Sequence, residues 1–119
     1  MSTPFPYSLL IAIPIMTFPL HVSISNQSLE YPLSVMTIEI DGKQIFQKQM
    51  RTGSQHNWEE VKDLSISGGE HTLHIIETST NISRTEELKV DRELWIVITF
   101  HGPNTGLKVD ILDHPVGFM

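Results

Sequence analysis

The chain has 119 residues, of which 39% are hydrophobic and 18% charged, a composition that suits one globular domain and is too apolar for a disordered chain. The net charge of -6, with 14 acidic and 8 basic residues and no dense Lys/Arg cluster, argues against a nucleic acid partner. Cysteine is absent, which excludes disulfides, thiolate catalysis and thiolate zinc sites. We therefore expect a single domain over residues 1–119 that is stabilised by packing and strand pairing.

The first apolar stretch, residues 7–20, permits two interpretations. It has the size of a signal peptide, but no Lys or Arg precedes it, and Pro14 and Pro19 interrupt it. It is shorter than the roughly 20 apolar residues that span a bilayer, so we expect no integral membrane span. We favour two core strands here, at residues 8–13 and 20–25, with an export signal or a membrane-seeking segment as the alternative. The compartment stays open.

A β-hairpin is predicted around the Asp-Gly dipeptide within residues 36–46 (MTIEIDGKQIF), because strict apolar/polar alternation leads into and out of it. A two-residue type I′ turn needs positive φ at both central positions, which Asp tolerates and Gly prefers. The turn length fixes the register, so we expect Ile38 opposite Ile45 and Ile40 opposite Lys43. One side of the hairpin would then be apolar.

Short β-rich runs separated by turn residues follow at a spacing of about ten residues, which is typical of a sandwich or a barrel. The run LWIVITF is apolar on both faces, as a central strand would be. No helical period of useful length is present. The sequence predicts an all-β fold, a single antiparallel β-sandwich of the immunoglobulin-like or jelly-roll kind with about eight or nine strands. The expected strands are residues 8–13, 20–25, 36–40, 44–50, 57–66, 71–78, 84–90, 94–100 and 107–112.

The same alternation predicts which side chains are buried. Trp58 shares one parity of the expected strand 57–66 with other apolar residues, so we expect it to anchor the core. Trp95 shares a face of its strand with Val97 and Thr99, which indicates a place in the core or at an interface. The predicted core consists of Trp58, Leu64, Ile66, Leu73, Ile75, Leu94, Ile96, Ile98 and Val109.

Two sets of residues could in principle bind a metal ion. His71 and His74 are three residues apart on one strand, so they point to opposite faces and cannot chelate one ion without distortion. The second set consists of acids near the ends of the last strands: Asp91, Glu93, Asp110 and Asp113. Calcium needs six to eight oxygens, and no Asp-x-Asp loop is present, so we expect solvated turn residues and no metal site.

The polar aromatic run QHNW supplies the candidate ligand-binding residues His56, Asn57 and Trp58. These side chains could stack on and hydrogen-bond a sugar or a peptide. The alternative is that Trp58 lies in the core and its two neighbours cap the strand. No Gly-x-Ser-x-Gly, phosphate-binding loop or paired-carboxylate motif is present, so we expect no enzyme, no catalytic residue and no cofactor.

Four segments in a fixed order carry a resemblance to known domains: residues 22–28 (VSISNQS), 40–43 (IDGK), 55–58 (QHNW) and 69–73 (GEHTL). The chain resembles small β-sandwich domains of the immunoglobulin-like or carbohydrate-binding-module type, in which an IDG hairpin precedes a tryptophan strand and a G-E/K-H turn. The resemblance covers roughly residues 20–100. It implies a non-catalytic recognition or accessory module.

We therefore expect a non-enzymatic binding or interaction module, with a protein or a carbohydrate as its ligand and no nucleic acid partner. The alternative is a structural or assembly subunit that forms a homo-oligomer. In that case the apolar run at residues 9–16 or an edge strand would pair with a second copy. The ligand and the oligomeric state stay open at this stage.

Overall fold

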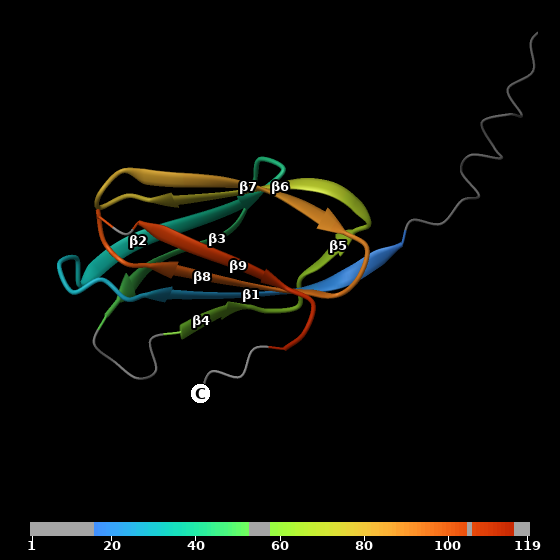
Figure 1. Ribbon diagram of the computed structural model, residues 1–119, viewed down its shortest axis with the longest axis horizontal. Coiled ribbons are helices and arrows are strands. Elements are labelled where there is room, and N and C mark those ends of the chain that lie inside the picture. The colour runs from blue at the N-terminus through green and yellow to red at the C-terminus, as the bar shows by residue number, and fades with distance from the viewer. Residues whose placement is uncertain (1–15, 53–57, 105, 116–119) are drawn as a thin grey trace, which may run out of the picture.

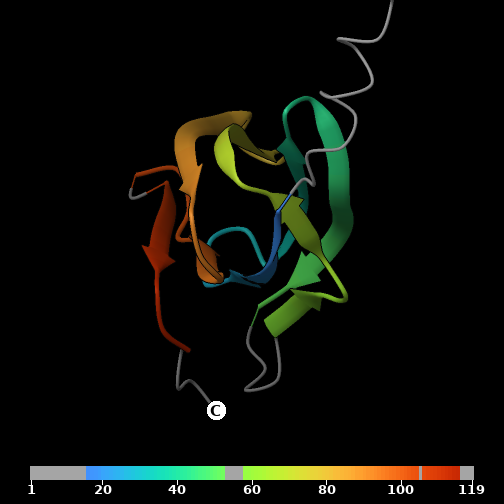
Figure 2. The ribbon, with the colours of Figure 1, turned by 90° about the vertical axis from the view of Figure 1, so that its right-hand side faces the viewer.

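The computed structural model describes residues 16–52, 58–104 and 106–115. Within these ranges there are nine strands and no helix, and the strands form two sheets that pack face to face (Figures 1 and 2). The expected all-β sandwich is confirmed, while the strand expected at residues 8–13 lies outside the described residues. The strands are β1 (Thr17–Asn26), β2 (Leu33–Ile40), β3 (Lys43–Arg51), β4 (Trp58–Val61), β5 (Ser65–Ser67), β6 (Gly69–Glu77), β7 (Ile82–Val90), β8 (Leu94–Phe100) and β9 (Leu107–Leu112).

The two sheets differ in strand direction. The first has the order β4-β1-β8-β9, with β5 also paired to β1, and the second has the order β3-β2-β6-β7. The second sheet is antiparallel throughout, as expected. In the first, β1 runs parallel to β8, from Leu20 opposite Leu94 to Asn26 opposite Phe100 (Figure 1). The antiparallel expectation is wrong for this pair, because side-chain alternation along a strand is the same for either direction of pairing.

The turn between β2 and β3 has the predicted geometry. Asp41 has φ of 53° and Gly42 has φ of 81°, so both central residues adopt the left-handed conformation that a type I′ turn requires. Ile40 lies opposite Lys43, as the turn length predicts. The turn therefore fixes the first pair of the hairpin.

A β-bulge changes the register of this hairpin one step further on. Ile38 lies opposite Phe46 instead of Ile45, while Glu39 remains opposite Gln44. The extra residue on β3 allows both Ile45 and Phe46 to pack against the core, although they are adjacent in the sequence. The prediction that Ile38 pairs with Ile45 is wrong for this reason.

The expected strand at residues 57–66 is divided into β4 and β5. Asp63, with φ of 52°, interrupts it, and both short strands pair with the same edge of β1. Leu64 continues the contact across the gap, since its carbonyl accepts a hydrogen bond from the Leu20 N–H at 3.0 Å. The alternation assumed for a continuous strand therefore does not hold across Asp63.

The core lies between the sheets and consists mainly of the inward-facing residues of β1, β2, β6 and β8. The other strands add Met50, Ile66, Leu88, Val90 and Leu107. Most of the predicted core residues are buried there, and Leu64 and Val109 are partly buried against them. Trp58 is the exception, because it lies on the outer side of the first sheet and is only partly buried. The predicted residues that are buried are Ile66, Leu73, Ile75, Leu94, Ile96 and Ile98.

Polar contacts bridge the two open sides of the sandwich. On one side, Lys48 of β3 forms an ion pair with Glu59 of β4. On the other side, Arg84 of β7 donates from Nη1 to the Leu107 carbonyl at the start of β9, at 2.7 Å. Each contact joins an edge strand of one sheet to an edge strand of the other, so neither pair of edges is held by apolar packing alone.

A fully buried carboxylate, Glu77, closes the end of the core. It accepts hydrogen bonds from the Ser34 hydroxyl of β2, the Ser79 and Thr80 N–H groups at 2.9 and 2.8 Å, and the Thr80 hydroxyl at 2.6 Å. Burial raises the pKa of this carboxyl, but the hydrogen bonds from Ser34, Thr80 and Ser79 outweigh it, and the net pKa is lowered. Glu77 therefore ties β2 to the β6–β7 turn as a carboxylate.

Candidate functional site

The outer side of the first sheet presents polar and aromatic side chains. Leu20, Val22 and Ile24 of β1 belong to the core, so the alternate residues of this strand point outward. Directly paired residues of adjacent strands point to the same side, which extends this surface onto β4 and β8. We call this side of the sheet the outer face; it consists of His21, Ser23, Ser25, Trp58, Glu60, Trp95 and Val97. Ser25 and Val97 point to this side but are covered by their neighbours.

Both tryptophans of the chain lie on the outer face. Trp58 of β4 lies opposite Ser25, and Trp95 of β8 lies opposite His21. β1 runs between the two strands, and each tryptophan is only partly buried. The sheet therefore places on one surface two large aromatic side chains for which the sequence predicts places in the core or at an interface.

His21 and Trp95 form a stacked pair. Their ring centroids are 4.8 Å apart and their planes differ by 9°. Nε2 of His21 also contacts Oε2 of Glu93 at 2.6 Å, which fixes the orientation of the imidazole. The stacked rings form an aromatic wall on the outer face, with His21 held by Glu93.

A groove of about 140 Å³ lies beside this wall. Ser23 and Val97, which are opposite each other on β1 and β8, line it together with the His21–Trp95 pair. Glu60 of β4 lines the other side. The groove therefore combines an aromatic wall, a carboxylate and a hydroxyl, the groups that bind ligands with both apolar and hydrogen-bonding surfaces.

The structure locates the sequence-predicted site only in part. His56 and Asn57 lie outside the described residues, whereas Trp58 lies on the outer face. His21, Ser23 and Glu60 line the groove but were not predicted as site residues. The alternation of residues 20–24 places His21 and Ser23 on the side opposite the apolar residues, but only the β1–β8 and β1–β4 pairings bring them beside Trp95 and Glu60.

A separate polar cluster consists of Asp41, His71 and Ser67. Nδ1 of His71 is 2.5 Å from Oδ2 of Asp41, and Nε2 is 2.8 Å from the Ser67 carbonyl and 3.4 Å from the Ser67 hydroxyl. The hydrogen bond to Asp41, together with that to the Ser67 carbonyl, raises the pKa of His71 against the opposing effect of burial.

The order aspartate, histidine and serine is that of a hydrolase triad, but the contacts differ. A general base must offer a free lone pair to the serine hydroxyl. Here the carbonyl and the carboxylate are both acceptors, so they favour an imidazolium that donates from both nitrogens. His71 therefore joins the β2–β3 turn to β5, and it does not activate Ser67.

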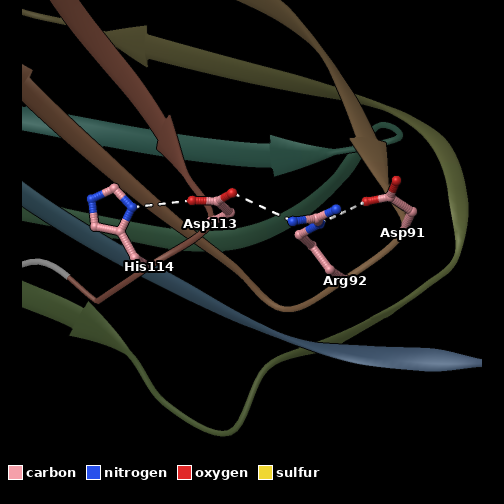
Figure 3. A network of polar contacts seen from close by, with 4 residues as sticks. All are labelled: Asp91, Arg92, Asp113 and His114. Carbon is pink, nitrogen blue, oxygen red and sulfur yellow. Dashed lines mark hydrogen bonds and ion pairs between the residues drawn. The ribbon is translucent and has the colours of Figure 1, made fainter.

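The acids near the last strands pair with basic side chains, as Figure 3 shows for two of them. Arg92 lies between Asp91 and Asp113, at 3.3 and 3.4 Å, and His114 contacts Asp113 at 3.1 Å. The hydrogen bond from His114 is the main cause of a lowered pKa at Asp113. In the described part of the chain, no group of three or more histidines and acids is placed to hold a metal ion.

The neighbouring histidines of β6 have separate partners. His71 contacts Asp41, whereas Nδ1 of His74 is 3.4 Å from Oε1 of Glu39 on β2. His71 shares the parity of the buried residues Leu73 and Glu77, and His74 has the opposite parity. The prediction that His71 and His74 point to opposite faces of the strand is confirmed.

Comparisons with protein-family models, with curated proteins and with solved structures find no match for this chain. Among the residues that the structure describes, no helix has the length and apolarity needed to cross a membrane.

Proposed function

We propose that the protein is a non-enzymatic binding module of the immunoglobulin-like or carbohydrate-binding-module type, and that its ligand binds across the outer face. The observation that carries the proposal is the position of Trp58 and Trp95. Both project from the same surface of the first sheet, and neither belongs to the core between the sheets. Aromatic side chains outside the core, beside polar groups, are typical of recognition surfaces.

The positions of the two tryptophans indicate an extended ligand. Trp95 and Trp58 lie opposite β1 residues that are four positions apart, His21 and Ser25. Strand geometry then separates their Cα atoms by about 13 Å along β1 and about 10 Å across the sheet, or about 16 Å in all. A ligand that contacts both would run diagonally over β4, β1 and β8.

The chemistry of the outer face favours a carbohydrate chain. Sugar rings have apolar faces that stack on tryptophan, and their hydroxyls can donate to the Glu60 carboxylate and exchange hydrogen bonds with Ser23. Glu93 already contacts His21, so it orients the aromatic wall. A peptide is the alternative ligand that the test below must distinguish.

The test is binding of the intact protein to arrays of neutral oligosaccharides and of peptides, followed by titration of the strongest ligand. Trp95→Ala and Trp58→Ala should each weaken oligosaccharide binding by about tenfold or more, as the loss of an aromatic contact does elsewhere. Leu29→Ala is the control, because Leu29 is 92% exposed in the loop after β1 and is not one of the outer-face residues.

Circular dichroism of each variant separates lost binding from lost folding. If only peptides bind, the carbohydrate proposal is wrong and the ligand is a protein. Oligosaccharide affinity that both tryptophan variants retain in full would overturn the outer face as the site.

A self-associating subunit is the second candidate, and one edge strand supports it. β9 is the last strand of the first sheet, and its Ile111 is 39% exposed although it pairs with the buried Ile96 of β8. Strand addition along β9 would cover this side chain. Sedimentation velocity should then show an oligomer that Ile111→Lys dissociates, whereas a monomer at all concentrations would exclude this mode.

A further inference from the structure

A second cavity lies at the end of the sandwich, between the β2–β3 hairpin and β5, and it is distinct from the outer face. Its volume is about 410 Å³. Ligand pockets in proteins have volumes of roughly 300–1,000 Å³, so this cavity can hold a small molecule. It lies between β5 of the first sheet and the start of β3 in the second sheet.

The interior of the cavity is apolar. Ile40 and Ile66, which belong to the core, form part of its lining. Ile45 and Leu64 also line it, and they are partly buried. A ligand in this cavity would therefore cover apolar surface that the sandwich leaves open at this end.

The rim of the cavity has one unpaired charge. The Asp41 carboxylate lines it but is occupied, because it accepts from His71 at 2.5 Å and from the Thr72 N–H at 2.9 Å. The Lys43 ammonium also lines the rim, and it has no hydrogen-bond or ion-pair partner within the described ranges. An anionic group is therefore the natural complement of this rim.

We propose that this cavity binds small amphipathic carboxylates, with the apolar tail against Ile40, Ile45, Leu64 and Ile66 and the head group beside Lys43. An ammonium head group would be repelled by Lys43 and would have to compete with His71 for Asp41. A neutral head group would gain the apolar contacts without the ion pair. The cavity should therefore rank an alkyl carboxylate above the matching alcohol and the alcohol above the matching amine.

The test is titration of the full chain with octanoate, 1-octanol and octylamine, followed by two-dimensional NMR of the backbone amides. Octanoate should bind most tightly, and the shifted amides should cluster at residues 40–45 and 64–67. Equal binding of the three probes, no binding of octanoate at millimolar concentration, or shifts confined to other regions would each overturn the proposal.

Substitutions in the protein test separately the contact with the head group and the contact with the apolar tail. Lys43→Gln should weaken octanoate binding by about fivefold, the effect of losing one exposed ion pair, and should leave 1-octanol unchanged. Lys108→Gln is the control, since Lys108 is an exposed lysine on β9, at the opposite edge of the first sheet from β5 and outside the cavity lining. Ser65→Trp should fill the cavity and abolish binding of both, and unchanged binding in this variant would also contradict the proposal.

Discussion

Single polar residues at the margins of the core determine how its loops are held. Glu77 is fully buried, yet it satisfies four donors from β2 and the β6–β7 turn. Glu77→Gln places an amide N–H₂ where one oxygen accepts hydrogen bonds, so we expect it to lower the free energy of unfolding by about 2 kcal/mol. Chemical denaturation measures this, with the exposed Glu87→Gln as the control; equal effects of the two variants would contradict the structural role of Glu77.

The same residue makes stability depend on acid. The pKa of Glu77 is lowered in the folded protein, so its contribution is present above its ordinary pKa of 4.5 and is lost as the pH falls through the folded value. Wild type should therefore lose more stability than Glu77→Gln as the solution is acidified below about pH 4.5. Parallel acid titrations of both proteins, followed by thermal unfolding, would show curves of the same shape if Glu77 did not contribute.

The Asp41–His71 pair gives the opposite dependence at higher pH. The pKa of His71 is raised above its ordinary value of 6.5, so its contribution is present below that value and is lost as the pH rises through the folded pKa. The pKa of Asp41 is lowered from 3.8, chiefly by the His71 hydrogen bond. The contribution of Asp41 to stability is therefore lost only in acid.

The melting temperature of the wild type should therefore fall as the pH rises above 6.5, and that of His71→Gln should change less over the same interval. His101→Gln is a suitable control because His101 is exposed and its imidazole hydrogen-bonds the nearby Thr99 hydroxyl, with no ion pair to a described residue. A wild-type profile that His71→Gln reproduces would contradict the pair's contribution.

At the scale of the elements, the β2–β3 turn depends on one glycine. Gly42 has φ of 81°, and a Cβ there would meet no atom within 4 Å, so a substitution costs backbone strain without a steric clash. Gly42→Val should lower the free energy of unfolding by about 1–3 kcal/mol. Gly42→Asn should cost less, because asparagine tolerates this conformation. Denaturation midpoints of the two variants that do not differ from the wild type would contradict the turn assignment.

Local sequence patterns predict most of these strands well, and the predictions fail at single residues. The alternation and the Asp-Gly dipeptide identify the hairpin, and the expected strands at 94–100 and 107–112 have the observed bounds. The alternation does not predict the bulge at Ile45 or the break at Asp63. Each is caused by a single residue, and the apolar and polar residues on either side still alternate. The break moved Trp58 from the predicted core to the outer face.

At the scale of the whole molecule, the arrangement depends on contacts between distant parts of the chain. β1 pairs with β4, β5 and β8, so each of its neighbours comes from a later segment. The outer face exists only after these pairings form. For this reason, the sequence indicates a sandwich and names Trp58, but it does not place His21, Ser23 and Glu60 beside the tryptophans.

These distant pairings also predict the order of folding. The β6–β7 hairpin closes through neighbouring residues, whereas β1 and β8 must join across most of the chain, at a higher entropic cost. Ile75→Val on β6 should therefore slow folding, and Val22→Ala on β1 should mainly speed unfolding. Both residues are buried. Stopped-flow kinetics of the two variants would contradict this order if Val22→Ala slowed folding and Ile75→Val did not.

The bulge in β3 also has a consequence for changes in chain length. Glu39 pairs with Gln44 and Ile38 with Phe46, so Ile45 is the extra residue between two consecutive pairs. Deletion of Ile45 would join these pairs into an uninterrupted ladder, and every other side chain of the hairpin would keep the face it has now. Deletion of Phe46 would also leave an uninterrupted ladder, because Ile45 would then take its place opposite Ile38. Position 45 is thus a place where related sequences could gain or lose one residue while the sandwich stays the same.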